Sequence, residues 1–166
     1  MSDEGVVEML LRYGGMEIKL TGSPNDVTKS FIEFMSKMLP AYDIANRLVL
    51  NVDLEKLVRD LEGIVAMTPE GIIVTLPRDL LGERETILLH LLKTSVGHQL
   101  GRLDEDSLSL ADILTETGGK PSTTAARLSE LVTQNWVERV GRGQYRITTF
   151  GARSFQESVI PRIRAG

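Results

Sequence analysis

Apolar residues recur at strand spacing near the start of the chain and at helix spacing soon after it. In residues 6–20, two apolar stretches flank Gly14-Gly15, and the second stretch alternates apolar and charged residues. This alternation predicts a β-hairpin with one solvent-exposed face. Ser23 and Pro24 then supply a helix cap and a proline suited to the first helical position, so a helix is expected to about residue 39. Its apolar stripe consists of Val27, Phe31, Phe34, Met35 and Met38.

The following forty residues predict a second small set of elements. Residues 48–52 have the composition of a short strand, and Asp53 can cap a short helix that Gly63 closes. A second hairpin is expected over residues 64–76, because the Thr-Pro-Glu-Gly turn separates two apolar stretches. Residues 1–79 are therefore expected to form one α+β domain of two hairpins and two helices. Its role would be dimerisation, ligand sensing or contact with another protein.

Residues 83–100 predict a helix that is apolar around more than half of its circumference. Such a helix must be buried against two surfaces, either between the two domains or against its own copy in a dimer. His90 and His98 lie on it eight positions apart, roughly 12 Å along the axis. That separation is too large for one metal ion to bind both.

The last third of the chain predicts two helices followed by two strands. Ser109 can cap a helix over residues 110–117, which Gly118-Gly119 ends, and a second helix is expected over residues 121–135. Two strands then flank a Gly-Arg-Gly turn, and a closing helix follows. This order is typical of a winged helix-turn-helix, so the predicted fold class is α+β, with a winged helix-turn-helix domain over residues 83–166.

Composition restricts the classes of function. The chain has 166 residues, of which 42% are hydrophobic and 5% aromatic, and it has no cysteine. Disulfides, thiolate metal sites and cysteine nucleophiles are thereby excluded. An acidic start and the lack of a long apolar run predict neither a signal peptide nor a membrane span, so a cytoplasmic location is expected. No phosphate-binding glycine motif, nucleophile elbow or metal-ligand cluster is present, so we expect no enzyme and no cofactor.

Charge is distributed unevenly along the chain. The net charge is −4, but residues 119–166 contain eight basic and three acidic side chains, a local net charge of +5. Attraction to phosphates depends on the local field, so this segment is where an anionic partner is expected to bind.

The segment from Leu108 to Phe155 resembles the winged helix-turn-helix domain of prokaryotic transcriptional regulators. The resemblance rests on the run STTAARLSELV, the apolar strand WVERV and the turn region GRGQYRIT. It implies a DNA-binding regulator with a recognition helix near residues 121–135 and a wing near residues 136–148, working as a homodimer on double-stranded DNA. One departure is the acidic link over residues 101–108, which would repel phosphate and is therefore expected on the side opposite the DNA.

Small and polar side chains at the start of the recognition helix would let its backbone enter a major groove, and arginines on the wing would reach phosphate. Trp136 is expected in the core. An alternative function is a protein-interaction module, in which the same winged helix docks a protein partner in a larger assembly. The candidate DNA-binding residues are Lys120, Ser122, Thr123, Ala126, Arg127, Arg139, Arg142, Gln144 and Arg146.

Overall fold

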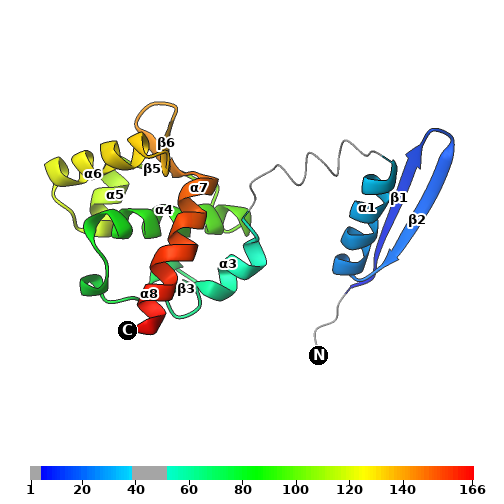
Figure 1. Ribbon diagram of the computed structural model, residues 1–166, viewed down its shortest axis with the longest axis horizontal. Helices are drawn as coiled ribbons and strands as arrows, with labels where there is room; N and C mark the ends of the chain where they lie inside the picture. Colours follow the sequence, from blue (N-terminus) through cyan, green and yellow to red (C-terminus); the bar gives the residue numbers. More distant parts are fainter. Residues whose placement is uncertain (1–4, 39–51) are drawn as a thin grey trace. The chain divides into compact units, whose positions relative to one another are not determined.

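The computed structural model describes residues 5–38 and 52–166 and divides the chain into two compact units, residues 1–50 and residues 51–166 (Figure 1). The fold class is mixed α+β, as the sequence predicts. Among the described residues the strands form three small antiparallel sheets, with the orders β1-β2, β3-β4 and β5-β7-β6.

The first unit contains the predicted hairpin and helix. Strand β1 (Val7–Tyr13) pairs with β2 (Met16–Gly22) across the two-glycine turn, and both glycines have positive φ angles of +55° and +80°. Helix α1 (Pro24–Met38) follows, and the hydroxyl of Ser23 accepts a hydrogen bond from the backbone N–H of Asp26 at 3.2 Å. Val27 is buried at 3% exposure. Of the strand predicted over residues 48–52, all but the last position lie outside the described residues.

The second unit begins with the other elements that the sequence assigned to the N-terminal domain. Helix α3 (Leu54–Asp60) is capped by Asp53, whose carboxylate accepts a hydrogen bond from the N–H of Lys56 at 3.1 Å. Strands β3 (Val65–Thr68) and β4 (Gly71–Val74) form the predicted hairpin, and a short 3-10 turn, η1 (Arg78–Leu80), follows.

The division of the chain differs from the predicted boundary near residue 79. Leu57, Leu61 and Ile64 belong to the same buried cluster as the central helix α4 (Glu83–Gln99). The C-terminal helix also holds α3: Arg164 donates a 2.7 Å hydrogen bond to the carbonyl oxygen of Asp60. Residues 52–81 therefore fold with the C-terminal part of the chain, because their apolar faces are covered there.

The remaining elements include the two helices and two strands predicted, in that order, with an additional two-residue strand before them and a closing helical segment that is divided into three parts. They are β5 (Leu108–Ser109), α5 (Leu110–Thr117), α6 (Pro121–Thr133), β6 (Val137–Val140), β7 (Gln144–Ile147), α7 (Thr149–Ser154), the π-helical turn η2 (Phe155–Val159) and α8 (Ile160–Ala165). The hydroxyls of Ser109 and Thr148 cap α5 and α7, as expected. Gly118 ends α5 with a φ of +68°, in the left-handed region that glycine enters without strain.

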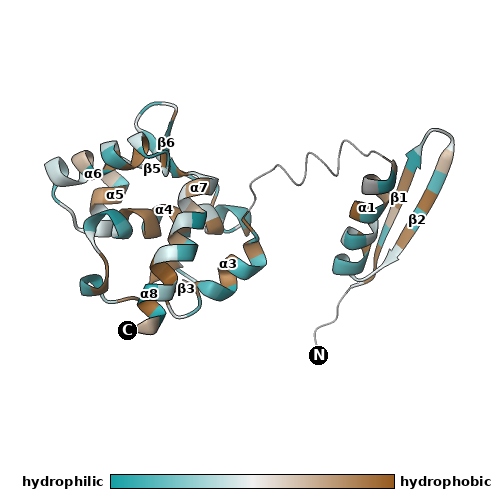
Figure 2. Cartoon of the chain, in the orientation of Figure 1, coloured by the Kyte–Doolittle hydropathy of each residue, from teal (hydrophilic) through white to brown (hydrophobic). Residues whose placement is uncertain are grey.

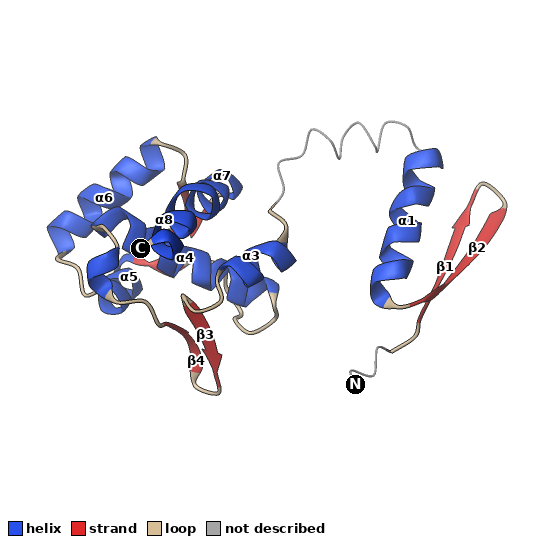
Figure 3. Cartoon of the chain, turned by 60° about the horizontal axis from the view of Figure 1, so that its bottom comes forward, coloured by secondary structure: helices blue, strands red, loops and turns tan. Residues whose placement is uncertain are grey.

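The middle of helix α4, from Ile87 to Gly97, is mostly buried within the second unit, whereas Glu83, His98 and Gln99 at its ends are exposed. It contacts α5, α6, α7, η2, β4 and β7, and Figures 1 and 3 show it among these elements. Leu88, Leu89 and Leu91 on this helix have no exposed surface, and Figure 2 shows its apolar residues in brown. The sequence allowed two arrangements for this helix: burial between two parts of the chain, or contact with its own copy in a dimer. The helix is buried between two parts of the chain, and both belong to the second unit. Its apolar surface therefore provides no reason to expect a dimer through this helix.

Trp136 is half-buried and packs against the core, with the guanidinium of Arg84 5.7 Å from its ring centroid. Within the described residues no helix has both the length and the hydropathy needed to cross a bilayer.

Candidate nucleic-acid interface

Helix α6 presents small side chains to solvent at its N-terminal end. Ser122 and Ala126 are exposed and Thr123 is half-buried, whereas Thr124 and Leu128 face the core. Pro121 occupies the first turn, where its missing N–H costs no helical hydrogen bond. The start of α6 is therefore narrow and polar, as the sequence predicts for a helix that enters a groove.

Arg127 is not a free cation on this face. Its Nε donates to a carboxylate oxygen of Glu83 at 3.1 Å, and its Nη1 donates to Glu130 at 2.7 Å. The hydrogen bond to Glu83, together with the charge of Glu130, raises the pKa of the guanidinium above its ordinary value. The sequence placed Arg127 on the groove-facing surface, but the structure turns the side chain towards the first turn of α4.

Arg146 on β7 is also held by two carboxylates. It donates to Glu138 at 2.7 Å and to Asp106 at 3.2 Å, and the hydrogen bond to Glu138 is the main cause of its raised pKa. Asp106 belongs to the acidic link that was expected on the side opposite the DNA. Pairing of Leu108 with Tyr145 brings the link alongside β7, next to one of the candidate DNA-binding residues. Gln144 lies in the same region and accepts a 3.3 Å hydrogen bond from Ser107.

Three of the candidate cations are exposed. Within residues 5–38 and 52–166, no carboxylate forms an ion pair with Lys120, Arg139 or Arg142. Arg142 lies at the tip of the turn between β6 and β7, and the guanidinium of Arg139 lies 5.9 Å from the ring centroid of Tyr145. The accessible positive charge of the C-terminal segment is therefore smaller than its net charge of +5 suggests.

A cavity beside the start of α6 adds a cation that sequence reasoning did not consider. It has a volume of about 250 Å³, and Arg78 from η1 lines it together with Lys120 and Arg127. The sequence assigns Arg78 to the boundary region between two domains, and no local motif marks it. Its position is decided by how residues 52–81 pack on α4.

A second polar cluster is centred on Glu116 of α5. Its carboxylate accepts hydrogen bonds from Nδ1 of His90 at 2.8 Å and from Nζ of Lys93 at 2.5 Å. Burial opposes ionisation of this carboxyl group, but the two hydrogen bonds and the neighbouring positive charge outweigh burial and lower its pKa. The sequence treated His90 as a surface or buried neutral residue and did not pair it with Glu116. In the described parts of the chain, no three His, Asp or Glu side chains are grouped to hold a metal ion.

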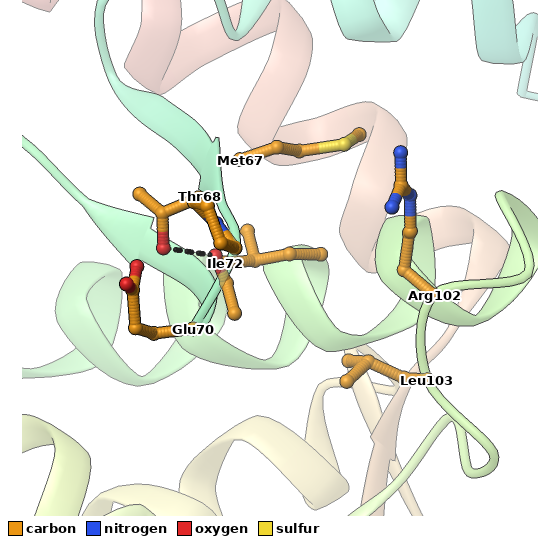
Figure 4. A pocket seen from close by; sticks show the side chains of 8 residues that line it. Met67, Thr68, Glu70, Ile72, Arg102 and Leu103 are labelled. Carbon is orange, nitrogen blue, oxygen red and sulfur yellow. Dashed lines mark hydrogen bonds between the residues drawn. The ribbon is translucent and has the colours of Figure 1, made fainter.

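The cavity in Figure 4 has a volume of about 510 Å³ and lies between the turn of the β3-β4 hairpin and the segment after α4. Met67, Ile72 and Leu103 give it an apolar wall, and Glu70 and Arg102 are the charged residues that line it. The hydroxyl of Thr68 donates to the carbonyl oxygen of Gly71 at 2.9 Å, so it closes the hairpin turn. This set of side chains does not define a reaction.

Comparison of the chain with models of protein families, with curated proteins and with solved structures finds no match. The candidate interface is therefore defined by three features of the chain itself: the small side chains at the start of α6, the exposed Lys120 beside them, and the exposed Arg139 and Arg142 on the β6-β7 hairpin.

Proposed function

We propose that residues 83–166 form a winged helix domain that binds double-stranded DNA, with α6 as the recognition helix and the β6-β7 hairpin as the wing. The order of the elements supports this proposal: a long helix, a short strand, two helices and two strands, with the three strands in the order β5-β7-β6. Figure 1 shows α6 and the turn between β6 and β7 along the upper edge of the second unit.

The observation that carries the proposal is the accessibility of Lys120, Arg139 and Arg142. An exposed cation without a carboxylate partner can neutralise a phosphate and release its counterion. Three such contacts predict that the logarithm of the binding constant falls with the logarithm of salt concentration with a slope of about −2.7. Arg127 and Arg146 contribute less, because each is already neutralised by two carboxylates.

The proposed protein is a cytoplasmic transcriptional regulator that acts as a homodimer, with recognition helices on two half-sites about one helical turn apart. The first unit, residues 1–50, would then supply dimerisation, ligand sensing or contact with another protein. We assign no catalytic activity to the interface, and the recognition is proposed to need no cofactor.

A second candidate function is docking of a protein partner through the winged helix. The neutral surface of α6 favours this alternative, since Ser122, Ala125, Ala126 and Ser129 are exposed and Arg127 is held back by carboxylates. Small neutral side chains fit a protein surface as well as a groove.

Fluorescence anisotropy of a labelled mixed-sequence duplex, measured at several salt concentrations, tests the DNA proposal. The variant Lys120→Ala/Arg142→Ala removes two proposed phosphate contacts and should reduce the salt slope by about 1.8. The matched control is Lys56→Ala/Arg102→Ala, which removes the same two charge types from exposed positions on α3 and after α4.

The control should bind almost as the wild type does. DNA binding would be refuted if the folded wild-type protein did not bind at low salt. The proposed surface would be refuted if both double variants weakened binding equally. Either result would favour the protein-docking function.

A further inference from the structure

The cavity of about 250 Å³ beside α6 is lined by several side chains that can donate hydrogen bonds. It is formed by η1, the first turn of α4 and the turn between α5 and α6. The side chains that line it include those of Arg78, Glu83, Lys120, Thr123, Thr124 and Arg127. Three of these side chains are cations and one is a carboxylate, so the lining has a net charge of +2.

Arg78 reaches the cavity because Gly118 has no side chain. A Cβ atom added at Gly118 would lie 2.8 Å from Nη1 of Arg78. Within residues 5–38 and 52–166, no carboxylate forms an ion pair with this guanidinium. Its charge is therefore available to a bound anion.

Thr124 contributes a hydroxyl group to the lining of the cavity. Its side chain is 4% exposed and lines the cavity, and among the described residues its hydroxyl forms no hydrogen bond. The hydroxyls of Thr86 and Thr117, by contrast, donate to carbonyl oxygens one turn earlier in their own helices. The hydroxyl oxygen is not closed off from solvent, so it can donate a hydrogen bond to a ligand oxygen in the cavity.

The start of α6 borders the cavity, which Lys120, Thr123 and Thr124 line. Lys120 is the N-cap residue of this 13-residue helix, and its side chain does not cap the first-turn N–H groups. The N–H groups of the first turn lack intrahelical acceptors, and the helix dipole favours negative charge at this end.

We propose that this cavity binds a phosphate group, held by Arg78 and Lys120 with the hydroxyl of Thr124 as an additional donor; Arg127, which two carboxylates already hold, adds only part of its charge. Two cations without a carboxylate partner among the described residues, together with a helix N-terminus, match a compact dianion with oxygens on all sides. The phosphate belongs either to a small phosphorylated molecule or to the backbone of the DNA. The inference goes beyond the proposed function, because Arg78 and Thr124 are not part of the proposed DNA surface and phosphate binding needs no DNA.

The site is tested by titrating the full chain with inorganic phosphate at constant ionic strength. Binding is measured by isothermal calorimetry and by the shifts of the amide NMR signals of Gly118 and Gly119. Arg78→Gln should weaken phosphate binding about tenfold, because it removes a charged hydrogen-bond donor. Arg102→Gln removes the same charge from an exposed position outside this cavity, so it should leave phosphate binding unchanged.

Two further variants keep the test informative if Arg78→Gln does not fold. Thr124→Val preserves shape and removes the hydroxyl, so phosphate binding should weaken. Glu83→Gln removes the one carboxylate from the lining and releases Arg127 from one of its two carboxylate partners, so phosphate binding should tighten. The Glu83 side chain is 62% exposed, so the change should not disturb folding. Tightening is a result that damage to the fold would not produce.

DNA binding by Arg78→Gln in phosphate-free buffer distinguishes the two sources. Loss of phosphate binding with unchanged DNA affinity assigns the site to a small phosphorylated molecule. Equal losses, with competition between phosphate and duplex, assign it to the DNA backbone. The site is refuted if the wild type does not bind phosphate, or if Arg102→Gln weakens binding as much as Arg78→Gln. Phosphate binding without any DNA binding would refute the proposed function and leave this inference intact.

Discussion

Replacing Glu116 by glutamine should destabilise the second unit far more than the loss of an ordinary surface ion pair. The carboxylate accepts hydrogen bonds from His90 at 2.8 Å and from Lys93 at 2.5 Å. The Lys93 side chain is only 9% exposed, so its ammonium group has little water to replace the lost partner. The variant leaves a buried positive charge without a compensating negative charge.

The expected cost follows from these exposures. Removing one partner of a fully buried ion pair costs roughly 3–5 kcal/mol, but water reaches the Glu116 side chain, which is 30% exposed. We therefore expect a loss of about 2–3 kcal/mol in the free energy of unfolding at neutral pH.

The loss should also depend on pH. Because the folded state lowers the pKa of Glu116, its stabilisation is complete above the unfolded pKa of about 4.3 and disappears as the pH falls through the folded value.

Urea unfolding of the wild type and of Glu116→Gln, at neutral and at acid pH, measures both effects. Glu55→Gln is the matched control, because its pairing with Arg59 is exposed and 3.8 Å long, and it should cost about 0.5 kcal/mol or less. Lys93→Met in the Glu116→Gln background should restore part of the stability by removing the stranded charge. A loss in the free energy of unfolding for Glu116→Gln no larger than that of the control would contradict the role assigned to the buried charge of Lys93. So would a difference in the free energy of unfolding between wild type and Glu116→Gln that widens as the pH falls.

Two further changes test the packing and the interface. Gly151→Ala should lower the free energy of unfolding, measured in urea, by about 1–3 kcal/mol, because the added Cβ atom would collide with the backbone carbonyl oxygen of Trp136. Gly82→Ala is the control, because its added Cβ atom meets nothing closer than 3.9 Å, and it should lower the free energy of unfolding less. Equal losses in the two variants would argue against the collision. Asp106→Asn should raise DNA affinity in the anisotropy assay, because it releases Arg146 from one of its two carboxylates at 3.2 Å. Asp104→Asn removes the same charge from the same link, so an equal gain would mean that only the net charge matters.

The positions of most described helices and strands follow from the sequence. Asp53, Ser109 and Thr148 each accept a backbone N–H three residues later, and these caps are visible in the sequence because the contact is local. The two hairpins are similarly marked by their glycine turns. Alternation and helical spacing then assign the inner faces without reference to the rest of the chain.

The interface could be predicted only in part. The sequence places cations and small side chains on the α6 and β6-β7 segments, and Lys120, Arg139 and Arg142 are exposed there. Whether an exposed cation contacts DNA is a property of the complex, and the function of these residues stays a prediction.

The tertiary structure alone decided which charges remain accessible and where the chain divides. Arg127 meets Glu83 across 44 positions, and Arg146 meets Asp106 across 40 positions. Arg78 reaches the cavity beside α6 because residues 52–81 pack on α4. A local pattern specifies a cap or a turn, since the interacting atoms are bonded neighbours or nearly so. The partners of a long side chain depend instead on how elements far apart in the sequence bury their apolar faces.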